Sequence, residues 1–576
     1  MIKANWTSKL RTFSSYLLGG NVLSLFLAAS IGIAQAAHHA DDSKVVEYIN
    51  GIIWTGTSGQ NYQASIMVTE GNKISYVGNQ RPAKLVADTV VDLKGGFVIP
   101  GLIDNHVHFI EGGAGLAAVQ LRDAKTKKEF ISRIAVQAKS LSAGQWVLYG
   151  NWDHESWGGE LPEKEWIDEQ TGDTPVFVMR IDGHMGFVNS AALKLAGITR
   201  DSKQPAGGEI VFNEDGEPTG VLKDTALDPI LAVLPSPTDE ELLKAVDAAQ
   251  RHALSLGLTQ VHVMTASANE SDAYRPFVLA DQKGLLRLRT IVYTPIQQWQ
   301  DVLADKSNKG SIYNYSSDLL RWGGFKGLTD GALGSTTAWF YDPYLDAPDK
   351  TGFPLIDQKD LEIMLSDSDA TSVDVAIHAI GDRAIDAVIE AMQNVAGDNI
   401  ANKRYRIEHF QHPSKAAIEA LAAHKIVASM QPYHAIDDGR WAEKRIGAER
   451  ILTTYAFKTI LDDGGILSFG SDWPVAPLAP LKGIYAAVTR QTIDGANPDG
   501  WMPQEKISVD QALRAYTASN AYAVNEDSIG GTLESGKRAD FVVLDQDLRT
   551  MPAEDIADAT VRMTVLNGVV EYQASK

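Results

Sequence analysis

The chain has 576 residues, of which 44% are hydrophobic and 22% charged, a balance typical of a globular protein with a large core. It contains no cysteine, which excludes disulfides, Cys-ligated zinc, iron–sulfur clusters and a thiol nucleophile. The formal net charge of −21 disfavours nucleic acid and anionic membranes as partners, so we expect the ligand to be a small molecule.

Residues 1–36 have the features of a secretory signal peptide. The segment starts with basic residues and no acidic ones, and residues 16–33 are mostly apolar. Ala34-Gln35-Ala36 then supplies the small residues of a signal-peptidase site. We therefore expect cleavage after Ala36 and export to the periplasm or the extracellular space, without stable membrane association. The alternative is an uncleaved anchor, because the apolar run approaches the length of a short transmembrane helix.

Both ends of the remaining chain are rich in strand and turn patterns. Asn50-Gly51 and Asn567-Gly568 each lie between two β-branched, apolar runs, which predicts a hairpin with a type I′ turn at each place. We expect residues 41–97 and 525–576 to form one small β-sandwich domain. Two unrelated terminal hairpins are the alternative.

A His-x-His pair follows the N-terminal β-rich region. The apolar run at residues 97–100 ends in a Pro-Gly break, and His106 and His108 come soon after it. On an extended chain, residues i and i+2 lie on one face, so both imidazoles can point at a single metal ion. Neutral imidazole is a common transition-metal ligand. Taken alone, the pair is equally compatible with a chance occurrence in a loop.

Residues 98–524 alternate strand-like runs with helical ones, which predicts a parallel sheet built from βα units. Polar residues end several of the strand-like runs, as they do where a (β/α)8 barrel builds its active site on its C-terminal face. These residues are Lys326, His378, His409 and Asp472. Their spacings of 52, 31 and 63 residues suit barrel strands four, five, six and eight, with the His-x-His pair on strand one.

The interval between His108 and Lys326, 218 residues, is too long for three βα units. We therefore expect an insertion after the first barrel strand, at about residues 112–235. Residues 233–237 contain two prolines and are interpreted as the linker back into the barrel. The expected fold class is α/β: a TIM-type (β/α)8 barrel, with a small β-sandwich domain formed by both termini and this insertion.

Seven motifs follow one another along nearly the whole chain. They are IPGLIDNHVH (99–108), DGH (182–184), KGLTDG (326–331), IHAIGD (377–382), RIEH (406–409), GSDWPV (470–475) and GKRADF (536–541). Together they resemble the amidohydrolase superfamily of metal-dependent hydrolases. The resemblance is closest to its amidohydrolase-3 (YtcJ-like) branch, which includes N-substituted formamide deformylase. None of the metal-site positions departs from the family pattern.

The resemblance implies a centre of one or two divalent metal ions, with Zn²⁺ expected, and a metal-bound hydroxide as the nucleophile. Its implied ligands are His106, His108, Lys326, His378, His409 and Asp472. In related enzymes the lysine is carboxylated by CO2 and bridges two ions; an unmodified Lys326 with one ion is the alternative. Asp472 occupies the position of the general base. His184 is placed to hydrogen-bond the substrate carbonyl oxygen, although it could equally fix a loop of the insertion.

Five further residues are candidates for substrate binding. Trp152 and Asp153 lie in the insertion, where lining the pocket and packing the insertion explain them equally well. His434 follows a predicted barrel strand, which favours a place in the pocket. Trp339 and Tyr344 follow the strand of Lys326 and could form an apolar wall.

The sequence therefore predicts an exported, metal-dependent amidohydrolase that hydrolyses a non-peptide amide C–N bond. The resemblance to a deformylase and the aromatic residues near the site favour an N-substituted amide or an N-acyl compound. The alternatives are a lactone, ester or small peptide as substrate, and a non-catalytic binding or regulatory protein on the same fold. The six filled ligand positions favour the enzyme. A homo-oligomer is compatible with the sequence.

Overall fold

The computed structural model of the chain describes residues 44–57, 63–116, 118–141, 144–265 and 273–575. The description below concerns the unit His38–Lys576. The expected signal peptide lies outside the described residues. Within the ranges described, no helix combines the length and the apolar character needed to cross a membrane.

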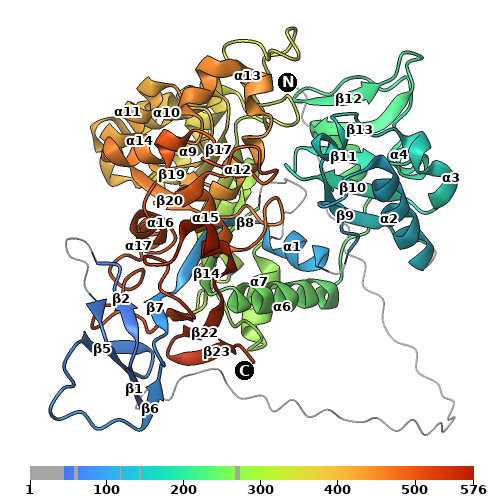
Figure 1. Ribbon diagram of the computed structural model, residues 1–576. Coiled ribbons are helices and arrows are strands. Elements are labelled where there is room, and N and C mark those ends of the chain that lie inside the picture. The colour runs from blue at the N-terminus through green and yellow to red at the C-terminus, as the bar shows by residue number, and fades with distance from the viewer. Residues whose placement is uncertain (1–43, 58–62, 117, 142–143, 266–272, 576) are drawn as a thin grey trace, which may run out of the picture. The chain divides into compact units, whose positions relative to one another are not determined.

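Eight parallel strands form the barrel at the centre of the described chain (Figure 1). In spatial order they are β8 (Leu102–Val107), β14 (Leu258–Met264), β15 (Arg289–Pro295), β16 (Leu320–Leu328), β17 (Asp374–Ala379), β18 (Arg406–His409), β19 (Val427–Met430) and β20 (Ile466–Phe469). The chain beyond β20 closes the ring, because Trp473 forms a parallel bridge with Val107. The predicted strand positions of Lys326, His378 and His409 are confirmed, and Asp472 follows the eighth strand.

Helices follow the barrel strands, and most of them bury apolar side chains in the same core as the strands. They are α6 (Asp239–Ser255), α7 (Arg275–Gln282), α8 (Trp299–Lys306), α9 (Gln358–Ala370), α10 (Asp382–Ala396), α11 (Lys415–Ala423), α12 (Pro432–Asp438), α13 (Ala442–Arg450), α14 (Phe457–Asp462), α15 (Pro480–Thr489), α16 (Val509–Ala515) and α17 (Ala518–Tyr522). Helix α10 shows the pattern: Ile385, Val388 and Met392 are fully buried on one face. Each such side chain stabilises the barrel by about 1.5–3 kcal/mol.

Strands from both termini form the predicted β-sandwich. One sheet has the order β5 (Lys73–Gly78), β4 (Ile66–Glu70), β1 (Val45–Ile49) and β6 (Thr89–Asp92). The other has the order β23 (Val569–Gln573), β22 (Val561–Leu566), β21 (Phe541–Leu544), β7 (Phe97–Pro100), β2 (Ile52–Trp54) and β3 (Gln63–Ala64). The antiparallel pair of β7 and β21 joins the two ends of the chain, and residues from both ends share one core. The composite domain is confirmed.

The first of the two predicted hairpins is wrong. Although Asn50 turns the chain with φ 58°, β1 pairs with β4 and β6, whereas β2 pairs with β3 and β7. Both edges of β1 are thus occupied, and the chain crosses at Asn50-Gly51 from one sheet to the other. Tyr48 and Ile53, on either side of the turn, are buried in the core between the sheets, which favours the crossing. The second hairpin, β22 and β23, is confirmed.

The insertion follows the first barrel strand in the sequence and precedes the second. It folds into a separate five-stranded sheet (Figure 1). It follows α1 (Phe109–Gly115), and its strands run in the order β12 (Gly208–Phe212), β13 (Pro218–Asp224), β11 (Met185–Val188), β10 (Val176–Arg180) and β9 (Val147–Trp152). Its helices are α2 (Lys127–Ser140), α3 (Asp168–Thr171), α4 (Ser190–Ala196) and α5 (Asp228–Leu231). Neighbouring residues of β10 enter different cores, Val178 with α2 and Phe177 with α4, so both faces of the sheet are covered.

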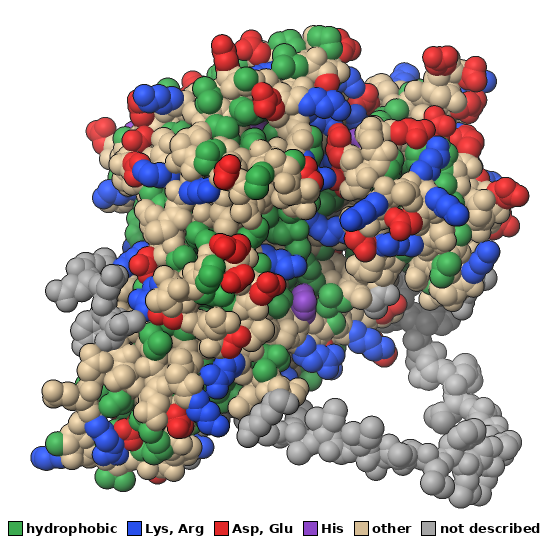
Figure 2. All heavy atoms as spheres, in the orientation of Figure 1, with side chains coloured by type: hydrophobic (Ala, Val, Ile, Leu, Met, Phe, Trp, Pro, Cys, Tyr) green, Lys and Arg blue, Asp and Glu red, His purple; other side chains and the backbone are tan. Residues whose placement is uncertain are grey.

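Charged side chains of both signs share the surface. On the face shown in Figure 2, acidic and basic side chains are interspersed over the barrel and the insertion. On the exposed side of α6, Lys244 pairs with Glu240 at 2.8 Å and Arg251 with Asp247 at 2.6 Å. Exposed helical pairs of this kind contribute only about 0.3–0.5 kcal/mol each. On this face the acidic excess of the chain is therefore dispersed.

Candidate metal centre

The strand ends of the barrel bring the predicted ligands to one place. Nε2 of His106, on β8, lies 3.2 Å from Nζ of Lys326, on β16. The ring of His409, at the end of β18, lies with its centroid 4.8 Å from that of His106 and 4.5 Å from that of His378. Residues that are far apart in sequence thus converge at the carboxyl ends of parallel strands, where a (β/α)8 barrel builds its active site.

His106 is held by a buried carboxylate that sequence reasoning did not single out. Nδ1 of His106 donates to Oε2 of Glu408 at 2.6 Å, and both side chains are fully buried. The same carboxylate accepts hydrogen bonds from Arg406 and, at 2.6 Å, from Oγ of Ser429. A histidine whose Nδ1–H is engaged in this way presents Nε2 to a metal, with its tautomer and ring orientation fixed.

Asp472 completes the tightest group of potential ligands. One ligand atom each from His106, His409 and Asp472 lie within 4.8 Å of one another. Oδ1 of Asp472 lies 3.0 Å from Nε2 of His108 and 3.5 Å from Nε2 of His106, yet among the described residues it accepts no aligned hydrogen bond. Buried carboxylate oxygens are normally satisfied, so this arrangement fits a cation at the centre of the group.

The backbone at two candidate ligands is strained. His409 has φ 72° and Asp472 has φ 60°, in the left-handed region that residues other than glycine rarely adopt. Such a conformation costs on the order of 1–3 kcal/mol per residue and persists where the surrounding structure enforces it. Nδ1 of His409 is meanwhile hydrogen-bonded to Oε1 of Gln431 at 2.9 Å. The strain serves to direct both side chains toward the centre.

The protonation states suit metal binding. Burial, helped by the charge of Lys326, lowers the pKa of His106 to about 4, and burial lowers that of His409 well below its ordinary value. Burial opposes ionisation of Asp472, but the nearby imidazoles of His106 and His108 outweigh it and hold the pKa well below the usual range. Burial also lowers the pKa of Lys326 to about 8. Neutral imidazoles and an ionised carboxylate are the forms that bind a divalent cation.

His378 and His108 lie at the edge of this group. Nε2 of His378 is 3.1 Å from the carbonyl oxygen of Gly331 and 3.4 Å from Oδ1 of Asp330. Asp330 is itself buried and accepts hydrogen bonds from the backbone N–H groups of residues 339, 380 and 381. The side chain of His108 keeps 28% of its surface exposed. Sequence reasoning missed Asp330, although the motif KGLTDG contains it.

The insertion contributes a histidine to the same region. The ring of His184 lies 5.1 Å from that of His378, centroid to centroid. Its Nδ1 is 2.7 Å from Oδ1 of Asp224, the third residue of this region that sequence reasoning missed, after Glu408 and Asp330. Burial opposes a positive charge on His184, but the hydrogen bond and negative charge of Asp224, with the charges of Asp182 and Asp330, raise its pKa above the ordinary value.

Three of the candidate substrate-binding residues lie in or beside this region. Nε2 of His434 is 3.9 Å from Oδ2 of Asp472, and its ring is parallel to that of His409, with the centroids 6.4 Å apart. Trp339 is half-buried, and its indole stacks on the guanidinium of Arg383 at 4.4 Å. Asp153 is buried and forms ion pairs with Arg180 at 2.9 Å and with Arg440 at 3.2 Å.

Trp152 and Tyr344 are both fully buried. Trp152 packs in a core of the insertion and donates from Nε1 to the carbonyl oxygen of Val178 at 2.9 Å. Tyr344 packs edge-on against Phe340, and its hydroxyl donates to the carbonyl oxygen of Ala338 at 2.8 Å. Packing explains the positions of both residues. For Trp152 this is the alternative to a place in the pocket.

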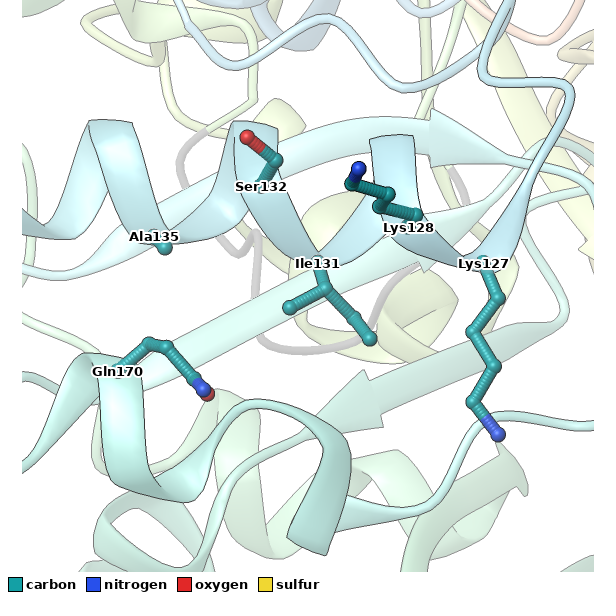
Figure 3. A pocket seen from close by; sticks show the side chains of 6 residues that line it. All are labelled: Lys127, Lys128, Ile131, Ser132, Ala135 and Gln170. Carbon is teal, nitrogen blue, oxygen red and sulfur yellow. The ribbon is translucent and has the colours of Figure 1, made fainter.

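A hollow of about 540 Å³ lies on the insertion, between α2 and α3 (Figure 3). It is lined by Lys127, Lys128, Ile131, Ser132, Ala135 and Gln170. These side chains include no histidine and no carboxylate, so the hollow offers no ligands of the kind that the barrel assembles.

Known proteins share this arrangement of sequence and fold. Residues 89–572 match the amidohydrolase family (Amidohydro_3). The chain is 37% identical to protein LONG AFTER FAR-RED 3 of Arabidopsis thaliana over 535 residues, which cover 91% of each chain. It is 28% identical to N-substituted formamide deformylase of Arthrobacter pascens, over 89% of this chain and 96% of the other. A crystal structure of an uncharacterized metal-dependent hydrolase from Pyrococcus horikoshii OT3 superimposes with a TM-score of 0.72 and 28% identity, covering 88% of this chain and 99% of that one. The chain belongs to the amidohydrolase family.

Proposed function

We propose that the protein hydrolyses an amide-type C–N bond of a small molecule, with an N-substituted amide or N-acyl compound as the substrate class. The observation that carries the proposal is the group formed by His106, His409 and Asp472 at the mouth of the barrel, with its unsatisfied buried carboxylate oxygen. The name of the deformylase relative supports the substrate class. Hydrolase chemistry is common to this family and to the solved structure that it resembles.

His106, His409 and Asp472 would hold the metal ion, with His108 and His378 beside them. When bound, a divalent ion, with Zn²⁺ proposed, lowers the pKa of water toward neutrality and polarises the substrate carbonyl. The ionised carboxylate of Asp472 would take a proton from the attacking water and return it to the leaving nitrogen. The low pKa of Asp472 keeps its carboxylate ionised, which is the form that can accept a proton.

Lys326 is proposed to be carboxylated. Its Nζ would form an N–C bond to CO2 and release a proton, which leaves an anionic carbamate in place of a cation. The reaction requires the neutral amine, and the pKa of about 8 makes that form accessible near neutral pH. A carbamate beside the buried imidazole of His106 would add oxygen ligands where a protonated lysine repels a metal ion. ¹³C NMR of protein equilibrated with labelled bicarbonate tests this, with a carbamate signal expected in wild type and absent in Lys326→Ala.

Export is also proposed, on the strength of residues 1–36 alone. N-terminal sequencing of protein secreted by a Gram-negative host should show a chain that begins at Ala37. An intact N-terminus in the membrane fraction would contradict export by cleavage.

Metal removal and re-addition against a panel of amides and esters tests the proposed function. We expect turnover of at least one N-substituted amide to disappear on chelation and to return with Zn²⁺. His409→Ala should abolish both metal binding and turnover. The matched control His424→Ala should retain both, because His424 caps the end of α11 and contacts Gln393 at 2.7 Å, not a candidate ligand. If apo and metal-loaded protein were equally inactive on every compound, the hydrolase proposal would fail.

A further inference from the structure

Arg406 is a fully buried cation in the interior of the barrel, next to the candidate metal centre. It lies on β18 two residues before Glu408, so both side chains project from the same face of the strand. Both residues are 0% exposed. Arginine is almost never fully buried unless it is paired, because its guanidinium stays charged. The partners of Arg406 therefore show what this buried charge does.

The guanidinium holds both carboxylate oxygens of Glu408. Nε of Arg406 donates to Oε1, and Nη2 donates to Oε2 at 3.1 Å. Such a two-point contact fixes the plane of a carboxylate as well as its distance. Oε2 also accepts from Oγ of Ser429 at 2.6 Å and from Nδ1 of His106 at 2.6 Å. The carboxylate thus cannot turn away from the imidazole without breaking its contact with the arginine.

The same guanidinium contacts three further barrel strands. Nη2 donates to the carbonyl oxygen of Asn105, on β8, at 2.8 Å. Nη1 lies 3.3 Å from Nδ1 of His262, on β14, and Cζ lies over the ring of Tyr293, on β15, at 5.6 Å from its centroid. Asn105 immediately precedes His106 in the chain. Arg406 therefore contacts the backbone that carries this histidine as well as the carboxylate that orients its ring.

The surroundings of Arg406 suit a guanidinium better than an ammonium. Its hydrogen-bonding neighbours are two carboxylate oxygens, a backbone carbonyl, a hydroxyl and an imidazole nitrogen, and each of them accepts from it. A guanidinium offers five N–H donors in a planar fork, whereas the three donors of an ammonium diverge from a single nitrogen. A lysine at this position would keep the charge but reach only some of these acceptors.

We propose that Arg406 is the positioning residue of the metal centre: it holds Glu408, and through Glu408 it sets the direction in which His106 presents Nε2. This inference rests on the metal centre of the proposed function, but not on its substrate. Because Glu408 balances its charge, the guanidinium can lie this close to a cation site. A ligand that is oriented before the ion arrives loses less entropy on binding, so the effect of Arg406 should appear in metal affinity.

Zinc titration of two arginine variants tests the proposal. We expect Arg406→Lys to weaken Zn²⁺ binding by about 10–100-fold, measured by competition with a chelator. Arg490→Lys is the matched control, because Arg490 is also 0% exposed but donates to the backbone carbonyl oxygens of Trp501 and Tyr455. Both variants should lower the urea midpoint of unfolding, whereas the control should keep wild-type Zn²⁺ affinity.

A serine variant tests the same contact without removing a charge, and it decides the question if Arg406→Lys does not fold. Oγ of Ser429 accepts from Arg406 at 3.0 Å and donates to Glu408, so it bridges the two. We expect Ser429→Ala to weaken Zn²⁺ binding by about 2–10-fold. Ser368→Ala is its control and should keep wild-type affinity, because this buried hydroxyl donates within α9 to the carbonyl oxygen of Met364.

The tautomer of His106 gives a readout that needs no ion. In metal-free wild type, ¹⁵N NMR of histidine-labelled protein should show its proton fixed on Nδ1, and both Arg406→Lys and Ser429→Ala should show a mixture of tautomers. Wild-type Zn²⁺ affinity in either variant, or equal weakening by Arg406→Lys and Arg490→Lys, would overturn the inference while the hydrolase function stood. Tight zinc binding by a wild-type protein that hydrolyses no compound would instead overturn the proposed function and leave the inference standing.

Discussion

Two histidine–carboxylate pairs lie in the same region, one from the barrel and one from the insertion. Glu408 holds Nδ1 of His106 at 2.6 Å, and Asp224 holds Nδ1 of His184 at 2.7 Å. The barrel pair is fully buried, and Arg406 neutralises its carboxylate. The insertion pair is partly exposed, and no lysine or arginine of the described residues forms an ion pair with its carboxylate.

Each carboxylate raises the pKa of its histidine, yet the net shifts in the two pairs are opposite. Burial and the charge of Lys326 lower the pKa of His106 to about 4, so its ring is neutral and can bind a metal. For His184, the charge and hydrogen bond of Asp224 overcome burial and raise the pKa, so its ring is suited to donate to an oxygen that gains negative charge. Environment, rather than the pair itself, sets the role.

The largest effect should come from the barrel side of the site. Asp472→Asn removes the proposed proton acceptor and should lower kcat by about 10²–10⁴-fold. The amide keeps an oxygen ligand, so metal content measured by atomic emission should remain close to that of wild type. Wild-type turnover in this variant would remove Asp472 from the proposed chemistry.

Glu408→Gln breaks the barrel pair and should weaken metal binding by about 10–100-fold, whereas Asp224→Asn should leave metal affinity unchanged. Metal titration of the two proteins measures this contrast. Because loss of a buried charge can cost about 3–5 kcal/mol, Ser429→Ala provides a milder variant that removes one hydrogen bond to the same carboxylate. If Glu408→Gln and Asp224→Asn weakened metal binding equally, the two pairs would not differ in their role at the metal.

In the metal-free protein, the pKa of His184 should be raised and that of His106 lowered. We expect His184 to remain protonated above its ordinary pKa of 6.5 and His106 to remain neutral until the pH falls to about 4. His184 thus stabilises the fold below pH 6.5 and loses this contribution as the pH rises through its raised pKa. His106 destabilises it as the pH falls below 6.5, because the unfolded chain binds a proton that the native chain does not. Histidine NMR across this range checks both directions, and coincident titrations would contradict the account.

The smallest effect should come from the ion pair of Asp153 with Arg440, which joins the insertion to the barrel. Arg440→Gln removes a charged partner of Asp153 and should lower the free energy of unfolding by about 1.5–3 kcal/mol, without changing metal content. Arg200→Gln, which removes an exposed pair with Glu217 in the same insertion, should cost about 0–1 kcal/mol. Urea unfolding of both proteins measures the difference. An equal loss of unfolding free energy in the two variants would mean that the pair of Asp153 with Arg440 does not hold the insertion in place.

The sequence was sufficient to predict the places of those site residues that follow one another at regular intervals along the chain. Intervals of one or two βα units placed His378 and His409 on the correct strands and Asp472 after the eighth strand. It was insufficient where a partner is distant: Glu408 meets His106 across 302 residues, and Asp224 meets His184 across 40. The turn at Asn50 was predicted correctly, but the pairing of the two strands that it connects was not. A tight turn does not determine whether the two strands share a sheet.

An anomalous-scattering map of zinc-loaded crystals tests the central claim most directly. We expect a peak within coordination distance of Nε2 of His106 and the carboxylate of Asp472, with His409 beside it. The insertion pair should lie outside the coordination sphere. A zinc-loaded crystal with no peak at this position, or with the ion bound by His184 and Asp224, would contradict the account.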